Sequence, residues 1–85
     1  MGNCMVLYSQ PNRLGFNRLG ITASTKVGGA VQRNRARRRL RESFRLVGLK
    51  QGFDIVIVAR SRAVTAPFDM IQREMRTLFY KLKML

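Results

Sequence analysis

The feature that most constrains the fold is a dense run of arginines between residues 26 and 44, since seven of the thirteen residues 33–45 are arginine. At about 100° per residue, the apolar residues of this run fall within one arc of roughly 80°. They are Ala36, Leu40, Phe44 and Val47. The opposite side, about 100° wide, forms a predicted arginine face, consisting of Asn34, Arg37, Arg38, Arg41 and Arg45. The pattern predicts a helix over residues 28–47 that packs by its apolar arc and presents guanidinium groups to the outside.

The start of this predicted helix favours phosphate binding. Gly28 and Gly29 give the backbone freedom where a strand must turn into a helix. A helix N-terminus presents unpaired N–H groups and a positive dipole end, and Arg33 and Asn34 lie within the first two turns. The alternative is a solvated helix face or a disordered basic tail, which a charge run alone would favour. The sorting of the arginines to one side argues against both.

Size and charge point to one small domain, residues 1–85, with a polyanionic partner. The chain is 46% apolar, which is normal for a globular protein, and its net charge is +13. So much charge repels itself in the compact state and is typical of nucleic-acid-binding proteins.

The side chains needed for catalysis are nearly absent from the sequence. There is no histidine, and the acids are scattered at Glu42, Asp54, Asp69 and Glu74. Neither a metal-binding Cys/His spacing nor a Ser-His-Asp set can be assembled. We therefore predict no catalytic residue and no protein metal site, and expect a partner to perform any reaction that the chain serves.

Other features predict the cellular setting. The single cysteine, Cys4, fits a reducing cytoplasm. No apolar run approaches 18 residues, so we expect no membrane partner and a cytoplasmic location.

Two strands are predicted before the arginine helix, at residues 5–10 and 18–24, and their short link predicts an antiparallel hairpin. A third strand, residues 54–60, is apolar on both sides and should be central in the sheet. Residues 61–66 are predicted to be a loop. The expected fold class is α+β, a small two-layer sandwich in the order β-β-α-β-α.

The last predicted helix spans residues 66–83. Thr65 is expected to be its N-cap, with Pro67 in the first turn. Its apolar stripe would consist of Phe68, Ile71, Met75, Leu78 and Leu82.

The combined pattern resembles the bacterial ribonuclease P protein subunit. The matching residues around the arginines are Lys26, Val27, Gly28, Ala30, Val31, Arg33, Asn34, Arg37, Arg38, Arg41 and Glu42. The resemblance extends to V-L-Y at residues 6–8, G-I-T-A-S at 20–24 and D-I-V-I-V-A-R at 54–60, so it covers nearly the whole chain.

The resemblance implies a ribosomal-protein-like fold with a left-handed β-α-β crossover, although general handedness rules predict the opposite. It also implies binding to a large catalytic RNA and to the 5′ leader of precursor tRNA. That RNA, with Mg²⁺ that it mainly binds itself, would remove the leader as the endoribonuclease of tRNA 5′ maturation. The alternative is a structural RNA-binding protein of ribosomal type without a role in cleavage.

The resemblance also implies roles for single residues. The RNA-facing positions would be Lys26, Arg33, Asn34, Arg37, Arg38, Arg41 and Arg45. The leader cleft would include Val6, Tyr8, Thr22 and Arg60. Each of three residues also has an alternative role without RNA. Tyr8 could simply expose its hydroxyl to water, Val6 could pack in the core, and Asn34 could make a local hydrogen bond.

Family members usually carry a further N-terminal helix whose aromatic residues form one wall of the leader cleft. This sequence opens at the first strand, either as a fragment, through a start assigned to an internal Met, or as a natural short form. Compared with a version that has the helix, we expect an open cleft, weaker leader binding and lower stability.

Overall fold

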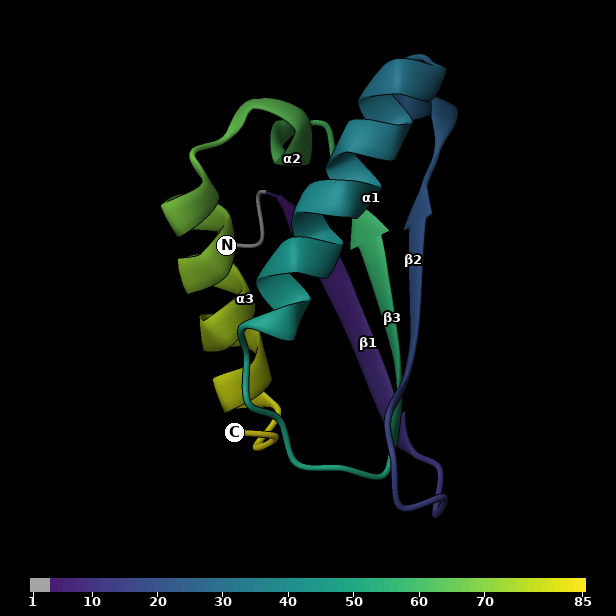
Figure 1. Cartoon of the computed structure of the whole chain (residues 1–85), viewed down its shortest axis with the longest axis vertical. Helices are drawn as coiled ribbons and strands as arrows, with labels where there is room; N and C mark the ends of the chain where they lie inside the picture. Colours follow the sequence, from purple (N-terminus) through teal and green to yellow (C-terminus); the bar gives the residue numbers. More distant parts are fainter. Residues whose placement is uncertain (1–3) are drawn as a thin grey trace.

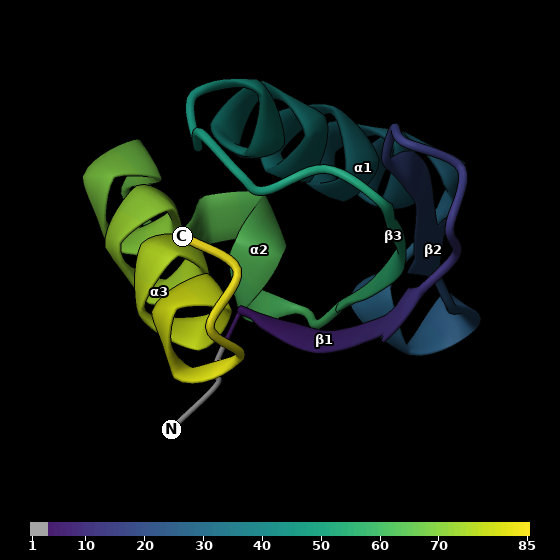
Figure 2. The same cartoon turned by 90° about the horizontal axis from the view of Figure 1, so that it is seen from below.

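The computed structural model describes residues 4–85. The described elements are β1 (Met5–Pro11), β2 (Arg18–Ala23), the 3-10 turn η1 (Thr25–Val27), α1 (Ala30–Arg45), β3 (Phe53–Ala59), α2 (Arg62–Thr65) and α3 (Phe68–Lys81). The sheet forms one layer, and the three helices lie on the same side of it (Figures 1 and 2). The predicted α+β class and β-β-α-β-α order are confirmed, with α2 as an additional short helix where a loop was predicted.

The predicted hairpin is wrong, because β3 lies between the first two strands. The strand order is β1-β3-β2, with β1 antiparallel and β2 parallel to β3. The central position of β3 was predicted correctly from its apolar residues on both sides. A strand of this kind gains most by pairing along both edges, and it separates the two strands that are adjacent in sequence.

Two asparagines in the link between β1 and β2 hold the start of β3 in place. The backbone N–H of Asn12 donates to the carbonyl of Gly52 at 2.9 Å, and the Asn17 carboxamide oxygen accepts from the N–H of Phe53 at 2.9 Å. The Asn17 amide group also donates to the carbonyl of Lys50 at 3.0 Å. The link therefore wraps around the incoming chain and does not form a tight hairpin turn.

The connection from β2 through α1 to β3 is a left-handed crossover, as the family resemblance implied. In Figure 1 both strands run upward, β3 lies to the left of β2, and α1 lies in front of the sheet; Figure 2 shows the same layers from below. The side chains of β3 alternate between the two faces of the sheet, and α1 packs on the face that carries the buried apolar ones. Ile55, Ile57 and Ala59 of β3 point into the core, where Ala36 and Leu40 of α1 are also fully buried.

The buried stripe of α3 differs from the predicted one. Ile71 and Met75 are buried as expected, but Phe68 is 37% exposed and Leu82 44% exposed. Phe79 takes the core position, with its ring 6.0 Å from that of Phe44 in an edge-to-face arrangement. The buried positions follow a spacing of four residues because only that narrow face of α3 meets α1 and the sheet.

The predicted N-cap Thr65 is also wrong, since this residue ends α2. Pro67 is the N-cap of α3, and Ala66 before it is extended, with ψ at 146°. A residue before proline is driven away from helical backbone angles, so the chain must leave α2 before α3 can start.

Glu74 of α3 fastens the start of β1. Its carboxylate accepts the backbone N–H groups of Cys4 and Met5 at 3.1 to 3.2 Å. Burial, and then the neighbouring Glu74 carboxylate, raise the pKa of the Cys4 thiol.

We expect Glu74→Ala to lower the free energy of unfolding by about 2 kcal/mol, because it leaves two backbone N–H groups without a partner. Thermal unfolding measures this as a fall in Tm of roughly 10 °C. Arg76→Ala is the control on the same helix, since Arg76 is exposed and its change should stay within about 0.5 kcal/mol. Equal Tm values for the two variants would contradict the role of Glu74.

Candidate nucleic-acid interface

The start of α1 is built by a short capped turn and a glycine. The Ser24 hydroxyl accepts the backbone N–H of Lys26 at 3.3 Å and so begins η1. Gly28 has φ at 142°, and a Cβ added there would lie 2.9 Å from Cβ of Gln32. Glycine is therefore required both for the backbone angle and for space. This turn leaves Lys26 exposed directly before the first helical residues.

The arginines of α1 divide into two groups, one of which is structural. Nε of Arg35 donates to the carbonyl of Val64 at 2.9 Å. Arg39 donates to the carbonyls of Ala63 at 3.0 Å, Val64 at 2.9 Å and Ala66. These two guanidinium groups pair the carbonyls at the end of α2, which is too short to satisfy them itself. Burial lowers the pKa of Arg39.

The arginine face, by contrast, is turned to solvent. Asn34, Arg38, Arg41 and Arg45 are exposed, and Arg37 is half-buried. The Asn34 carboxamide oxygen accepts from Arg37 at 2.5 Å, so the local bond predicted as an alternative for Asn34 is present and orients its neighbour. Arg45 lies 3.8 Å from Glu42 in an exposed pair one turn away, which stabilises little in water.

Arg33 occupies a different place from the rest of the predicted RNA-facing residues. It is half-buried, and its guanidinium donates to the carbonyl of Gly28 at 3.1 Å. This bond folds the side chain back along the first turn of α1, toward η1. Arg33 therefore supports the start of the helix as well as adding charge to it.

Within residues 4–85, one face of the sheet carries no helix, and this face brings together most of the predicted cleft residues. This open sheet face consists of Val6, Tyr8, Gln10, Arg18, Gly20, Thr22, Asp54, Val56 and Val58. The register places Val6, Val58 and Thr22 in one row across the strands. Tyr8 lies in the next row and is 60% exposed, which places its ring outside the core.

Two hollows lie on this side of the molecule. The smaller, about 280 Å³, is lined by Tyr8, Ser9, Gln10, Asp54 and Val56. The larger, about 390 Å³, is lined by Val6, Ser24, Lys26, Val27, Val58, Ala59, Arg60 and Ser61. The second hollow joins two predicted cleft residues, Val6 and Arg60, to the predicted RNA-facing Lys26. Thr22 does not line it but lies in the same strand row as Val6.

Sequence reasoning missed Val56 and Val58 as members of this face. Val56 is 41% exposed and Val58 half-buried, although the strand was expected to be covered on parts of both sides. The signal was present in the alternation of β3, because residues 54, 56 and 58 share one face. Only the pairing of β3 with both β1 and β2 showed that this face of the strand belongs to the open sheet face.

An ion pair ties the end of the open sheet face together. Arg18 binds the Asp54 carboxylate through two contacts of 2.7 Å, and the Asn12 amide group donates to the same carboxylate at 2.9 Å. The Arg18 bond, followed by the Asn12 bond, lowers the pKa of Asp54 from 3.8 to about 2.

This lowered pKa predicts an acid-dependent loss of stability. Because the folded value lies below the unfolded one, the stabilisation is fully present above about pH 4 and is lost as the pH falls toward 2. Thermal unfolding of the native chain and of Asp54→Asn between pH 2 and 6 should show a Tm difference that shrinks toward pH 2. A difference that stays constant over this range would show that Asp54 does not titrate in this way.

The described residues contain no group of three or more histidine, cysteine or acidic side chains placed to hold a metal ion. In residues 4–85 no helix combines the length and apolar character needed to cross a membrane. What the geometry offers is a row of guanidinium groups, an exposed aromatic ring and a basic hollow. Such a set can bind phosphates and an unpaired nucleotide.

Comparison with known proteins identifies relatives of this architecture. Residues 1–83 match the family model described as Ribonuclease P. The ribonuclease P protein component of Dehalococcoides mccartyi is 47% identical over 85 residues, covering 100% of this chain and 71% of the relative. That of Thermoanaerobacter sp. is 49% identical over 79 residues, covering 91% and 68%.

Solved structures agree with these sequence matches. The RNase P protein of Staphylococcus aureus has a TM-score of 0.82 at 30% identity, covering 99% of this chain and 79% of that structure. The RNase P protein from Thermotoga maritima has a TM-score of 0.80 at 28% identity, covering 92% and 76%.

Proposed function

The chain belongs to the ribonuclease P protein family and is a protein subunit of this RNA-based endoribonuclease; on that premise we propose how its surfaces serve the enzyme. The arginine face, with Lys26 and Arg33 beside it, holds phosphates of the catalytic RNA. The open sheet face, with Val6, Tyr8, Thr22 and Arg60, receives the 5′ leader of precursor tRNA. The chemistry of leader removal belongs to the RNA.

The observation that carries this proposal is the division of labour among the α1 arginines. Arg35 and Arg39 donate hydrogen bonds to the carbonyls of α2. Arg38 and Arg41, by contrast, are exposed and make no hydrogen bond within the described residues. Guanidinium groups kept on one helix face without a protein partner match the bidentate geometry of phosphate oxygens.

Mg²⁺ supplies charge neutralisation and an activated nucleophile in phosphodiester hydrolysis. The described acids do not fit a site for it: no three of them lie together, Asp54 is bound to Arg18, and Glu74 is bound to backbone N–H groups. We therefore propose that Mg²⁺ is bound mainly by the partner RNA, and assign the protein no step that passes through the metal.

The shape of the open sheet face supports leader binding. A single-stranded leader presents unstacked bases, and an exposed tyrosine ring offers a surface on which one base or ribose can stack. Tyr8 lines the small hollow, and Val6, two residues before it on the same face of β1, lines the basic hollow together with Lys26 and Arg60. A strand running along this face from Tyr8 would therefore meet positive charge at one end.

The testing experiment reconstitutes the chain with bacterial ribonuclease P RNA and follows precursor tRNA cleavage at low Mg²⁺. We expect the chain to increase cleavage, and we expect Tyr8→Ala to weaken binding of leader-containing precursor about tenfold, the cost of one lost base stack. Binding of mature tRNA, which has no leader, should not change. Tyr8→Phe is the matched control, because it keeps the ring and should bind the leader normally.

Two results would count against the proposal. Cleavage that does not increase when the chain is added would favour a structural RNA-binding role of ribosomal type. Equal losses for precursor and mature tRNA in Tyr8→Ala would remove the leader from the open sheet face.

A further inference from the structure

A second basic surface lies where the end of α3 meets the connector that precedes β3, distant from the start of α1. Its hollow, about 400 Å³, is lined by Lys50, Tyr80, Lys81, Lys83 and Leu85. Tyr80 is 73% exposed. In Figure 1 the chain end marked C lies at the lower end of the molecule, opposite the start of α1 at the upper end. We call Lys50, Tyr80, Lys81 and Lys83 the lysine surface.

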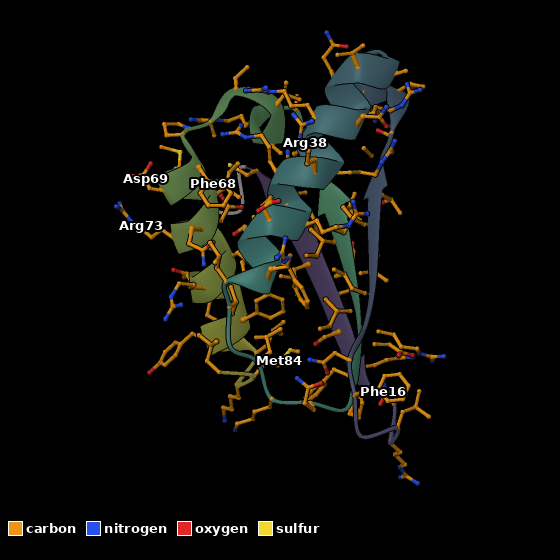
Figure 3. All side chains as sticks on the ribbon, in the orientation of Figure 1. Phe16, Arg38, Phe68, Asp69, Arg73 and Met84 are labelled. Atoms are coloured by element: carbon orange, nitrogen blue, oxygen red, sulfur yellow. The ribbon has the colours of Figure 1, made fainter. Side chains whose placement is uncertain are left out.

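Backbone bonds bring the lysines of this surface together. The N–H of Lys50 donates to the carbonyl of Met84 at 2.8 Å, so two segments distant in sequence are joined there. After α3 the N–H of Met84 donates to the carbonyl of Phe79 at 3.1 Å, and that of Lys83 to Tyr80 at 3.0 Å. These two bonds form a Schellman motif. The two residues at the positions of its usual apolar contact, Phe79 and Met84, are both buried in the core; Met84 is labelled in Figure 3.

Lys83 occupies the one position of this motif that strongly favours glycine. Its φ is 60°, in the left-handed region, where a side chain is disfavoured. A lysine at such a site lowers stability relative to glycine. Backbone strain of this kind is commonly retained where the side chain has a function.

The lysines of the lysine surface form no ion pair within 4.0 Å among the described residues. Lys50, Lys81 and Lys83 are all exposed, and none makes a side-chain hydrogen bond or ion pair there. The described acids are engaged elsewhere or lie at a distance along the helix, as Asp69 does at the start of α3. Like charges gathered around one hollow repel each other, and an anionic partner relieves that repulsion.

We propose that the lysine surface is a second RNA-binding site of this subunit, which holds phosphates on its three ammonium groups and stacks a base or ribose on Tyr80. The proposal rests on the role of the chain in ribonuclease P. The longest dimension of the molecule is 36 Å, and the lysine surface lies at the opposite end from the start of α1, so RNA bound there and beside Lys26 is held at two separate places. The phosphates belong either to the catalytic RNA or to precursor tRNA.

The first experiment compares the native chain with the triple variant Lys50→Gln, Lys81→Gln, Lys83→Gln in two binding assays at several salt concentrations. One assay measures binding to ribonuclease P RNA alone, and the other measures binding of precursor tRNA to the assembled enzyme. We expect about tenfold weaker binding in one assay, with its salt slope reduced by about 2, because three phosphate contacts are lost. The assay that changes identifies which RNA is bound.

The second experiment separates function from stability at Lys83. Lys83→Gly should raise Tm by about 4 °C, since it relieves the left-handed backbone, and should weaken the same RNA interaction two- to fourfold. Arg13→Gly is the matched control. Arg13 also has φ at 60° and loses one charge, but it lies in the link between β1 and β2. The Arg13→Gly variant should therefore gain stability without losing RNA affinity.

Unchanged affinity and salt slope of the triple variant in both assays would overturn the proposal. Equal losses of RNA binding in Lys83→Gly and Arg13→Gly would also overturn the proposal, because equal losses would reflect only the change in net charge. If the lysine variants bind normally while arginine-face variants fail, only this inference falls. If both sets bind normally, the proposed RNA-binding function falls as well.

Discussion

Replacing Arg37, Arg38 and Arg41 together by alanine is expected to weaken binding to the catalytic RNA on the order of 100-fold at physiological salt. All three lie on the arginine face, and none bonds to the core or to α2; the only described bond among them is that of Arg37 to Asn34. The fold should therefore survive, with a change in unfolding free energy of less than about 0.5 kcal/mol for each exposed site.

Salt titration gives the most direct measurement. If about five guanidinium groups of α1 neutralise phosphates, log K should fall with log salt at a slope of roughly −3 to −4. In the triple variant the magnitude of this slope should fall by about 2, because each lost phosphate contact reduces it by about 0.7. A slope near zero for the native chain would contradict the proposed RNA face altogether.

The matched control removes the same charge from other parts of the surface. The variant Arg13→Ala, Arg73→Ala, Arg76→Ala also lowers the net charge from +13 to +10, since three positive charges are lost. These arginines are exposed, and Arg73 points away from the body of the molecule (Figure 3). We expect less than about fivefold weaker binding from the general electrostatic effect. Equal losses in the two triple variants would show that position on α1 is irrelevant.

The second large effect is expected at Arg39, but on stability. Arg39→Met keeps much of the apolar stem and removes the bonds to the carbonyls of Ala63, Val64 and Ala66. The carbonyls of Ala63 and Ala66 then lose their charged donor, and that of Val64 keeps only Arg35, which should lower the free energy of unfolding by about 3 kcal/mol. For a chain of this size that corresponds to a fall in Tm of roughly 12–20 °C.

The control for this prediction is the neighbouring residue. Arg38→Met changes the same chemical group one position away, where the guanidinium is exposed and makes no hydrogen bond within the described residues. It should leave Tm nearly unchanged and weaken RNA binding instead. Loss of RNA affinity without loss of stability in Arg39→Met would mean that the two arginine groups have been assigned the wrong way round.

The alternation and helical periodicity of the sequence predicted local structure well. Residues 5–10, 18–24 and 54–60 were expected to be strands, and each lies within one residue of the strand observed. The apolar arc of α1 was correct at Ala36 and Leu40, and Val6 and Tyr8 were placed on the same side of β1. These features depend on neighbours within a turn or a strand, which the order of residues contains.

Errors arose where the outcome depended on partners distant in sequence. The hairpin was expected because β1 and β2 are joined by a short link, but the gain from pairing both edges of β3 separates them. Phe79 replaced Leu82 and Phe68 in the core because the angle between α3 and α1 decides which residues of the helix are covered. Neither the strand order nor that angle can be inferred from periodicity.

The sequence by itself determined that this protein is a folded basic domain with arginines gathered on one helix face. It also determined that the chain belongs with ribonuclease P protein subunits. Both follow from side-chain spacing and signature residues, which are local properties of the sequence. Only the tertiary structure decided which arginines of α1 bond to α2 and which face solvent. Arg35 and Arg39 look like their neighbours in the sequence, and it is the carbonyls at α2, 24 to 29 residues away in the chain, that engage them. Hydrogen bonds between distant segments form only once the chain is folded, so the division between anchoring and RNA-facing arginines is a property of the fold.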